Sequence, residues 1–343
     1  CTANLPDPTI ADGSTAFDTK LWTGTGSSQS ITGYGFSPDF VWIKSRSETR
    51  DHALFNTIQG IHKRLQSNTT EAEQSSSITV TAFNSDGFTL GGQSRTNANN
   101  QTYVGWAWDA GSSTATNYSG SINSQVRASQ SSGVSVVKWT GTGSDETVGH
   151  GLGAKPAFIF SHSISNSGQW PTYHIAYGAT KYTYFNSSIE ARTYSFFWNN
   201  TEPTASVFSI GSDADISGNN RTHIAYCFAP VAGFSAFGSY TGGGSNNVFV
   251  FTEFRPRWIL VKNSSNSANW FILDSKRSPN NKVDDALLPN QDYSEDANNS
   301  GYEMDFLSNG FNVTASNLVS NGSGDTYIYA AFAEHPFKTA RAR

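Results

Sequence analysis

The sequence is poor in cysteine and in charge, and it has no long hydrophobic run. Only two cysteines, Cys1 and Cys227, occur among 343 residues, which excludes a framework of several disulfides. Cys227 lies in an apolar run, where we expect a small buried side chain. Charged residues make up 14% of the chain, the net charge is −5, and no basic stripe favours nucleic-acid binding. No apolar run approaches about 18 residues, so we expect no membrane insertion.

The first residue allows two interpretations. A chain that begins with Cys1 is either a fragment of a longer protein or a processed product such as a mature lipoprotein. The residues that follow, CTANLPDPTIADG, contain no tether-like run of Ser and Gly. We therefore favour the fragment.

Motifs of the common catalytic classes are also missing. The sequence has no GxSxG, HExxH, CxxC or P-loop motif. The recurrent TGTGS and TGGGS segments are not followed by a helical pattern, so we expect hairpin turns instead of phosphate loops. The seven histidines are scattered without ligand spacing, and we expect each to be a surface or strand residue. The sequence therefore predicts a protein that is not an enzyme and uses no cofactor.

One segment carries a weak signal for a metal site. In DADISGNN, Asp213, Asp215 and Ser217 precede Gly218 as at the start of an EF-hand calcium loop. The twelfth position is Ile224, where a bidentate glutamate is required, and a strand is expected next. A solvated turn is the favoured interpretation, with Asp213, Asp215 and Ser217 as the weak metal candidate.

What the sequence has in abundance is aromatic residues, and they recur in a fixed order. Each of three segments, which we call the first, middle and last units, contains an aromatic-Thr-Gly, a Pro before or in an apolar strand, an Asn, a Phe and an aromatic closing strand. In chain order these landmarks are Trp22, Trp139 and Tyr240; Pro38, Pro156 and Pro256; Asn68, Asn186 and Asn290; Phe88, Phe208 and Phe311; and closing strands from Thr102, Thr222 and Thr326. Successive prolines are 118 and 100 residues apart (156−38 and 256−156). A collinear repeat of this length indicates duplication of a small domain.

The units are predicted to be β structure. Their apolar runs are short, rich in β-branched and aromatic residues, and bounded by Gly, Asn, Ser and Pro. Alternation in VSVVKW from Val134 indicates that one face is more buried than the other. The one segment compatible with a short helical turn is ALFNTIQG from Ala53. We predict an all-β chain of three tandem, homologous, antiparallel β-sandwich-like domains of about 100–120 residues: 1–112 with an N-terminal lead-in, 113–232 and 233–343.

Aromatic residues in the repeated strands are predicted to anchor three cores. The candidates are Trp42, Phe158 and Trp258 in the Pro-containing strands and Trp106, Tyr226 and Tyr329 in the closing strands. Because strand neighbours point to opposite faces, the anchor in each strand is this residue or its immediate neighbour.

The last unit has an acidic stretch, DDALLPNQDYSED, without an evident counterpart in the other two. Loops on a rigid scaffold vary without disturbing the core, so this stretch is the candidate surface recognition loop. Its candidate residues are Asp284, Asp285, Asp292, Tyr293, Glu295 and Asp296. A glycosidase would need two carboxylates across a cleft, and a solvated insertion is favoured over that alternative.

Long stretches of the chain resemble a known family. WTGTGSSQSITGYGFSPDFVWIKSR, YCFAPVAGFSAFGSYTG and the ending TYIYAAFAEHPFKTARAR are similar to the repeated C-terminal region of tail-fibre or other virion appendage proteins of tailed bacteriophages, particularly marine ones. The resemblance covers essentially the whole chain. It implies a structural protein of an extracellular virion, without catalytic residues. Its implied partners are further copies of the chain, for example in a homotrimer, other virion proteins and host-surface glycans.

Three functions from different classes are therefore compared. The favoured one is a non-enzymatic virion structural or host-attachment module. The second is a secreted or lipid-anchored bacterial carbohydrate-binding protein that stacks Trp or Tyr rings on sugars. The third, which we favour least, is a polysaccharide-cleaving enzyme.

Overall fold

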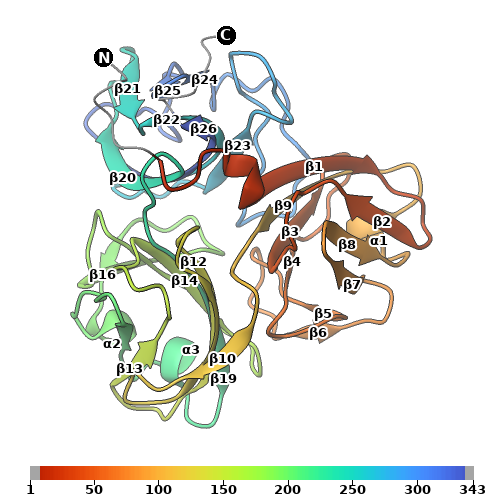
Figure 1. The fold of residues 1–343 in the computed structure, drawn as a ribbon. Helices are drawn as coiled ribbons and strands as arrows, with labels where there is room; N and C mark the ends of the chain where they lie inside the picture. Colours follow the sequence, from red (N-terminus) through yellow and green to blue (C-terminus); the bar gives the residue numbers. More distant parts are fainter. Residues whose placement is uncertain (1–7, 337–343) are drawn as a thin grey trace.

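The chain folds into several antiparallel β-sheets, and the all-β prediction is confirmed (Figure 1). The computed structural model describes residues 8–336, so Cys1 and the last seven residues lie outside the described part. The helices in that part are single turns: α1 (Ser94–Asn97), α2 (Ser195–Trp198) and α3 (Ala214–Ser217).

Three large sheets share one strand order, in which the closing strand lies between the opening strand and the Pro-containing strand. In the first unit the order is β1 (Phe17–Thr23), β9 (Thr102–Trp108), β3 (Phe40–Ser45), β4 (Ala53–Asn56). In the middle unit it is β12 (Val134–Thr140), β19 (Thr222–Phe228), β14 (Phe158–Ser163), β15 (Pro171–His174). In the last unit it is β20 (Ser235–Thr241), β26 (Thr326–Pro336), β22 (Phe254–Asn263), β23 (Phe271–Asp274). The middle sheet is longer, with β10 (Thr114–Asn117) and β11 (Ser124–Ser129) at one edge and β16 (Lys181–Tyr184) and β17 (Arg192–Thr193) at the other.

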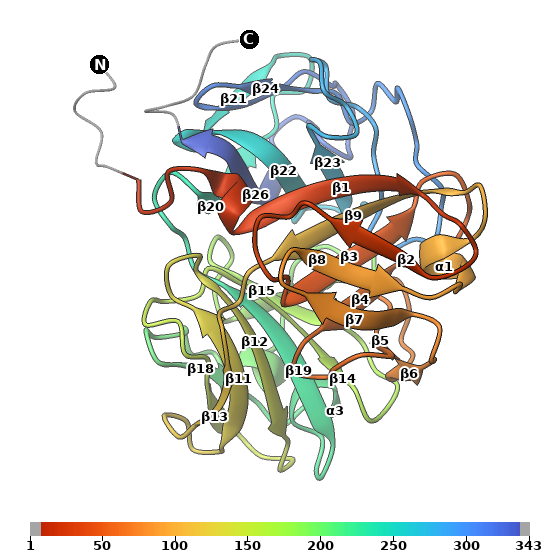
Figure 2. The same ribbon diagram turned by 45° about the vertical axis from the view of Figure 1, so that its right-hand side comes forward.

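A small sheet accompanies each large one and gives each unit a sandwich-like form. The small sheets are β2 (Gln29–Thr32), β8 (Gly87–Leu90), β7 (Val80–Asn84); β13 (Glu146–Gly149), β18 (Val207–Ile210); and β21 (Val248–Phe251), β25 (Gly310–Val313), β24 (Met304–Leu307). A further short pair joins β5 (Lys63–Arg64) to β6 (Gln74–Ser75). Figure 2 shows the β2–β8–β7 sheet lying across the first large sheet. The repeated Phe88, Phe208 and Phe311 lie in these small sheets and are fully buried.

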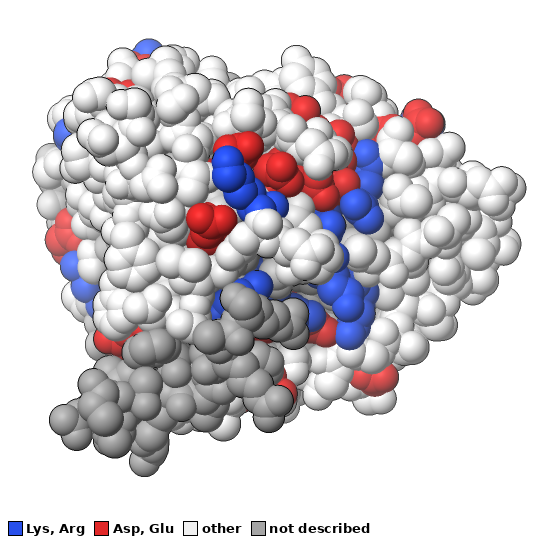
Figure 3. Space-filling model, turned by 90° about the horizontal axis from the view of Figure 1, so that it is seen from above, with Lys and Arg blue, Asp and Glu red and all other residues white. Residues whose placement is uncertain are grey.

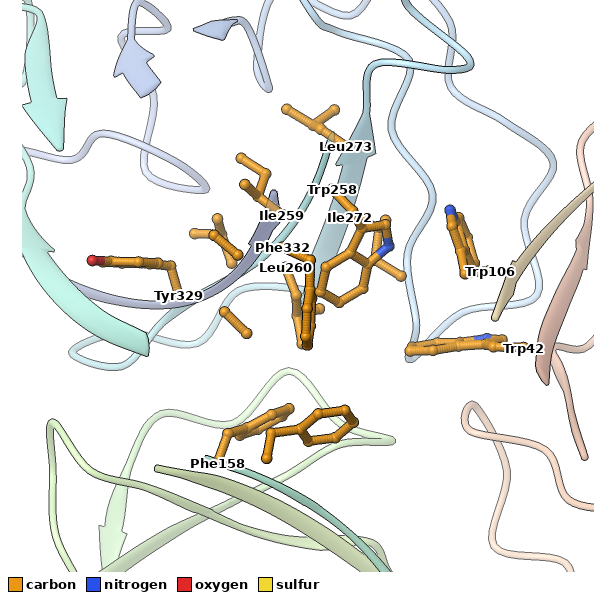
Figure 4. Close-up of a cluster of buried hydrophobic side chains, with 14 of the residues drawn as sticks. Trp42, Trp106, Phe158, Trp258, Ile259, Leu260, Ile272, Leu273, Tyr329 and Phe332 are labelled. Carbon is orange, nitrogen blue, oxygen red and sulfur yellow. The ribbon is translucent and has the colours of Figure 1, made fainter. Parts of the chain in front are cut away.

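The predicted anchors do not build three separate cores, which corrects that expectation. Trp42, Phe158, Trp258, Trp106 and Tyr226 belong to one buried cluster that all three units share (Figure 4). The cluster includes the last residue of each closing run: ring centroids of Trp108, Phe228 and Phe332 are 6.2, 5.8 and 5.7 Å apart around a triangle. Tyr329 belongs to the same cluster and packs against Phe311 of its own unit, with 5.3 Å between ring centroids.

The alternation in VSVVKW is present in β12, but both faces of this strand are buried, so the prediction that one face is more buried than the other is wrong. Val134 and Val136 join the shared cluster, whereas Val137 faces the core of the middle unit. In β3, likewise, Trp42 points to the shared cluster and Val41 to the local core. One face of each large sheet packs against the small sheet of the same unit, and the other face packs against the shared cluster.

Two local predictions are corrected by the pairing of strands. ALFNTIQG begins as β4, where Ala53–Asn56 pair with β3 instead of forming a helical turn. The Thr-Gly segments are not hairpins, because β1 and β2 belong to different sheets. A Cβ at Gly24 would lie 2.2 Å from the carbonyl oxygen of Ala98, so close backbone approach requires glycine there.

Candidate functional site

The three units are arranged as a closed ring (Figure 1), and neighbouring units meet at three junctions. Each junction has two equivalent backbone hydrogen bonds. The N–H groups of Arg50, Gly168 and Ala268 donate to the carbonyls of Asp292, Thr70 and Ser188, at 2.8, 2.9 and 2.9 Å. The N–H groups of Glu295, Glu73 and Ala191 donate to the carbonyls of Arg46, Ile164 and Ser264, at 2.8, 3.0 and 2.9 Å. The units are thus joined first to middle, middle to last, and last to first.

The repeated asparagines hold the loops that form these junctions. The side-chain oxygens of Asn68, Asn186 and Asn290 accept the backbone N–H groups of His52, Trp170 and Trp270, at 2.9, 3.1 and 3.0 Å. In each unit the residue two positions after the Asn supplies the carbonyl that the neighbouring unit's N–H contacts. An Asn in each unit therefore holds the start of a loop whose backbone is hydrogen-bonded to the neighbouring unit.

The acidic stretch of the last unit contains one of these junction loops. The Asp292 carbonyl accepts the Arg50 N–H, and the Glu295 carboxylate accepts hydrogen bonds from Arg46 and Arg277. The counterparts of residues 290–295 (NQDYSE) are 68–73 (NTTEAE) and 186–191 (NSSIEA), which share the leading Asn and one or two carboxylates but differ at most other positions. Of the six candidate residues, Tyr293 and Asp296 are exposed, while Asp284, Asp285, Asp292 and Glu295 are partly buried.

A buried ion network surrounds Glu295 at the junction between the last and first units. Arg277, fully buried, donates to Asp274 at 2.5 Å and to Glu295 at 2.9 Å, and the Trp106 indole N–H donates to Asp274 at 3.1 Å. Burial opposes ionisation of Glu295, but the hydrogen bond from Arg46 and the charge of Arg277 lower its pKa. On the face in Figure 3, charged side chains gather in a band near the centre and most of the surface is uncharged.

The weak metal candidate has a local structural role. One Asp213 oxygen accepts the Asp215 N–H at 2.8 Å at the start of α3, and the other accepts the Tyr194 hydroxyl at 2.9 Å. Ser217 is buried, and its hydroxyl donates to the Ser144 carbonyl at 3.0 Å. Among residues 8–336, no group of three or more His, Cys, Asp or Glu is placed to hold a metal ion.

Sequence reasoning missed a face lined by tyrosines beside Asp213. Tyr182 and Tyr184 lie two residues apart in β16, Arg192 is opposite Tyr182, and Tyr194 follows Arg192 by two. Strand neighbours two positions apart share a face, so these four residues, which we call the tyrosine face, point the same way. The alternation in KYTY could have indicated a strand with both tyrosines on one face, but four residues are too few to assign a strand from the sequence.

The expectation that each histidine is a surface or strand residue holds for His162, His174 and His223, which lie in β14, β15 and β19, whereas His52 and His150 are buried outside the strands. His52, His150, His162, His174 and His223 are fully or almost fully buried. Burial lowers the pKa of the last four to about 4, and it also lowers the pKa of His52 well below the ordinary value. At His52, Nδ1 accepts the Trp42 indole N–H at 2.8 Å and Nε2 donates to the Leu288 carbonyl at 2.9 Å. This neutral imidazole therefore links the first and last units.

Cys227 is buried in β19, and burial raises the pKa of its thiol, as expected for a core residue. None of the described helices has the length and apolar character to cross a membrane.

Two comparisons place the chain among known proteins. Residues 12–336 match a family that is described as "Domain of unknown function (DUF7483)". A search of curated proteins finds no match.

Proposed function

We propose a structural role for this chain, which belongs to the family described as a domain of unknown function (DUF7483). The proposed protein is a non-enzymatic component of a bacteriophage virion, in a tail fibre, capsid fibre or similar appendage, and it contributes to host-surface attachment. The resemblance of the sequence to virion appendage proteins motivates this proposal. The observation that carries it is the ring of three units with matching junction hydrogen bonds.

We also propose that the three units are tandem homologous domains. The support for this is the common strand order and the equivalent registers: Phe40 opposite Trp108, Phe158 opposite Phe228, and Trp258 opposite Phe332. In all three units an Asn side chain accepts a backbone N–H, and the carbonyl two residues after that Asn accepts an N–H of a neighbouring unit. Chance does not explain this threefold repetition. We call the ring of three units the head. It resembles a cyclic trimer within one chain, in which each unit contacts its two neighbours through two different surfaces.

A head of this kind suits an extracellular particle for a physical reason. Each unit buries aromatic surface against the other two, so local opening of one unit costs contacts in all three. We propose that the head associates with other virion proteins and with further copies of the chain.

The test is the location of the chain. Antibodies against the chain, followed by gold labelling and peptide mass spectrometry of purified particles, are expected to detect it at an appendage. Purified particles that lack the chain would remove the virion role, whether or not the isolated chain binds a ligand.

A test of the proposed attachment role requires point substitutions, because deletion of residues 284–296 would remove the junction between the last and first units. Tyr293 is 56% exposed and Asp296 is also exposed, so Tyr293→Ala with Asp296→Ala should spare the fold. We expect intact particles with reduced adsorption to host cells. Tyr118→Ala, at a tyrosine that is 73% exposed elsewhere, is the matched control. Unchanged adsorption of the double variant would remove the attachment role of this loop.

The carbohydrate-binding alternative is favoured by a different observation, the tyrosine face. Partly exposed aromatic rings beside carboxylates suit the mixed apolar and polar surface of a sugar. In this alternative the chain is a bacterial secreted or lipid-anchored protein, and the same search of purified particles would find none of it.

A further inference from the structure

We propose that the tyrosine face of the middle unit is a saccharide-binding site. Its residues are Tyr182, Tyr184, Arg192 and Tyr194, with Asp213 and Asp215 at its margin. The inference deepens the proposed attachment role by naming a site and a ligand class. Binding by the isolated chain does not require that the chain belong to a virion, so the two proposals can fail separately.

The three tyrosines are held by one buried side chain. Their ring centroids lie 4.8, 5.8 and 4.9 Å from that of Phe197, which is 1% exposed. Tyr182 also lies 5.0 Å from Tyr184 and 5.8 Å from Tyr194. All three tyrosines remain partly exposed. Phe197 therefore holds a cluster of three partly exposed rings, which we call the platform, in which Tyr182 is inclined by 59° to both Tyr184 and Tyr194. Because these rings are already held in place, little conformational entropy is lost when a ligand binds.

Polar groups surround this platform. Asp213 accepts the Tyr194 hydroxyl at 2.9 Å. Arg192, whose side chain is 53% exposed, pairs with Glu190 at 2.9 Å. Burial raises the pKa of Tyr184 most, Tyr182 raises it next, and the charges of Asp215 and Asp213 contribute less. Carboxylates accept hydrogen bonds from sugar hydroxyls and guanidinium groups donate to them.

The platform is not part of the repeated scaffold. Counted from the repeated Asn, the positions of Tyr182 and Tyr184 are Arg64 and Gln66 in the first unit and Ala286 and Leu288 in the last. Arg64 and Gln66 are hydrogen-bonded to each other at 2.8 Å. The tyrosines pack against the core of the middle unit, but two units fold without an aromatic platform at this place, so the repeated scaffold does not require it.

The polar margin favours a saccharide over a purely apolar partner. Arg192 and Glu190 pair with each other, but an apolar surface over them would remove the water that satisfies their remaining polar atoms, which is costly. A pyranose ring presents C–H groups on a face and hydroxyls around its edge, so it can contact the rings and the charged groups together.

Native gel electrophoresis of the whole chain in gels that contain a polysaccharide tests the proposal. The probes are dextran, laminarin and bacterial lipopolysaccharide, each compared with a gel without polysaccharide. We expect at least one probe to retard the wild-type chain. Tyr182→Ala with Tyr184→Ala should weaken this binding by about tenfold or more, because both rings of β16 are removed. Tyr194→Phe keeps the ring and removes the hydroxyl, so a smaller loss is expected.

The matched control is Tyr118→Ala. Tyr118 follows β10, at the opposite edge of the same eight-stranded sheet from β16, so its loss should leave retardation unchanged. Circular dichroism and thermal unfolding of each variant separate loss of binding from loss of fold. Wild-type chain that no probe retards would overturn the proposal, as would a folded double variant that is retarded as strongly as wild type.

Discussion

Trp42 shows how much the packing depends on single side chains. It is 1% exposed, lies 5.5 Å from Trp106 and 5.6 Å from Phe185 of the middle unit, and its indole N–H donates to His52. Trp42→Ala is expected to lower the free energy of unfolding by about 3–5 kcal/mol.

Urea unfolding of Trp42→Ala measures this loss. Ile61→Ala is the control, because Ile61 is 43% exposed and its truncation should change stability by about 0.5 kcal/mol or less. Equal effects of the two substitutions would contradict the burial of Trp42.

The buried histidines predict acid sensitivity. The pKa values of His150, His162, His174 and His223 are lowered from an ordinary value near 6.5 to about 4, and that of His52 is lowered as well. Between these values the unfolded chain binds more protons than the folded one, so stability falls as the pH falls from about 6.5 towards 4. Asp39, whose pKa is raised to about 6 mainly by burial, acts in the opposite sense, as do Asp215 and Asp284, whose pKa values burial also raises. The five histidines outnumber these three carboxyls.

Urea unfolding at several pH values measures the slope of this loss. His174→Gln should reduce the slope by up to about 1.4 kcal/mol per pH unit, because one titrating group is removed. Stability that is constant or rises on acidification would show that the imidazoles titrate normally.

At the scale of elements, the junction loops depend on the repeated asparagines. Asn290 is 4% exposed; its oxygen accepts the Trp270 N–H at 3.0 Å and its amide donates to Asn269 at 2.8 Å. Asn290→Ala leaves a buried N–H without its partner, so we expect a loss of about 1–3 kcal/mol in unfolding free energy.

The corresponding control is Asn99→Ala at an exposed position, with an expected change of about 0.5 kcal/mol or less. Thermal or urea unfolding compares the two. A loss at Asn99 as large as that at Asn290 would mean that the Asn290 contacts contribute little.

At the scale of the whole molecule, the junction between the last and first units differs from the other two. At the other junctions the chain itself connects the neighbouring units. At this junction Arg46 of the first unit pairs with Glu295 of the last unit, and Glu295 also pairs with Arg277 of its own unit. Glu295→Ala removes one partner of the fully buried Arg277, which should cost roughly 3 kcal/mol.

Amide hydrogen exchange shows where the ring opens in Glu295→Ala. Exchange of the Arg50 N–H, bonded to the Asp292 carbonyl, should accelerate more than that of the Gly168 N–H at the junction of first and middle units. Glu303→Ala breaks an exposed pair with Lys282 and should cost less than about 1 kcal/mol. Uniform acceleration at both amides would indicate global destabilisation without selective opening.

The sequence by itself determined the strands and their repetition. Aromatic and β-branched runs between Gly, Pro and Asn specify strands locally, and the collinear landmarks align Pro38 with Pro156 and Pro256. The all-β class could therefore be predicted, as could the equivalence of the Pro-containing strands. Candidate sites were predicted less well, because Asp213 and Glu295 form their contacts with residues distant in sequence or with local backbone.

Only the tertiary structure decided which faces meet. Val41 and Trp42 are both apolar and both buried, and alternation places them on opposite faces without stating what covers each face. Non-local packing sends one to a local core and the other to the shared cluster. The same packing brings Arg46 to Glu295 and encloses His52, because burial and pairing depend on neighbours that the chain supplies from other units.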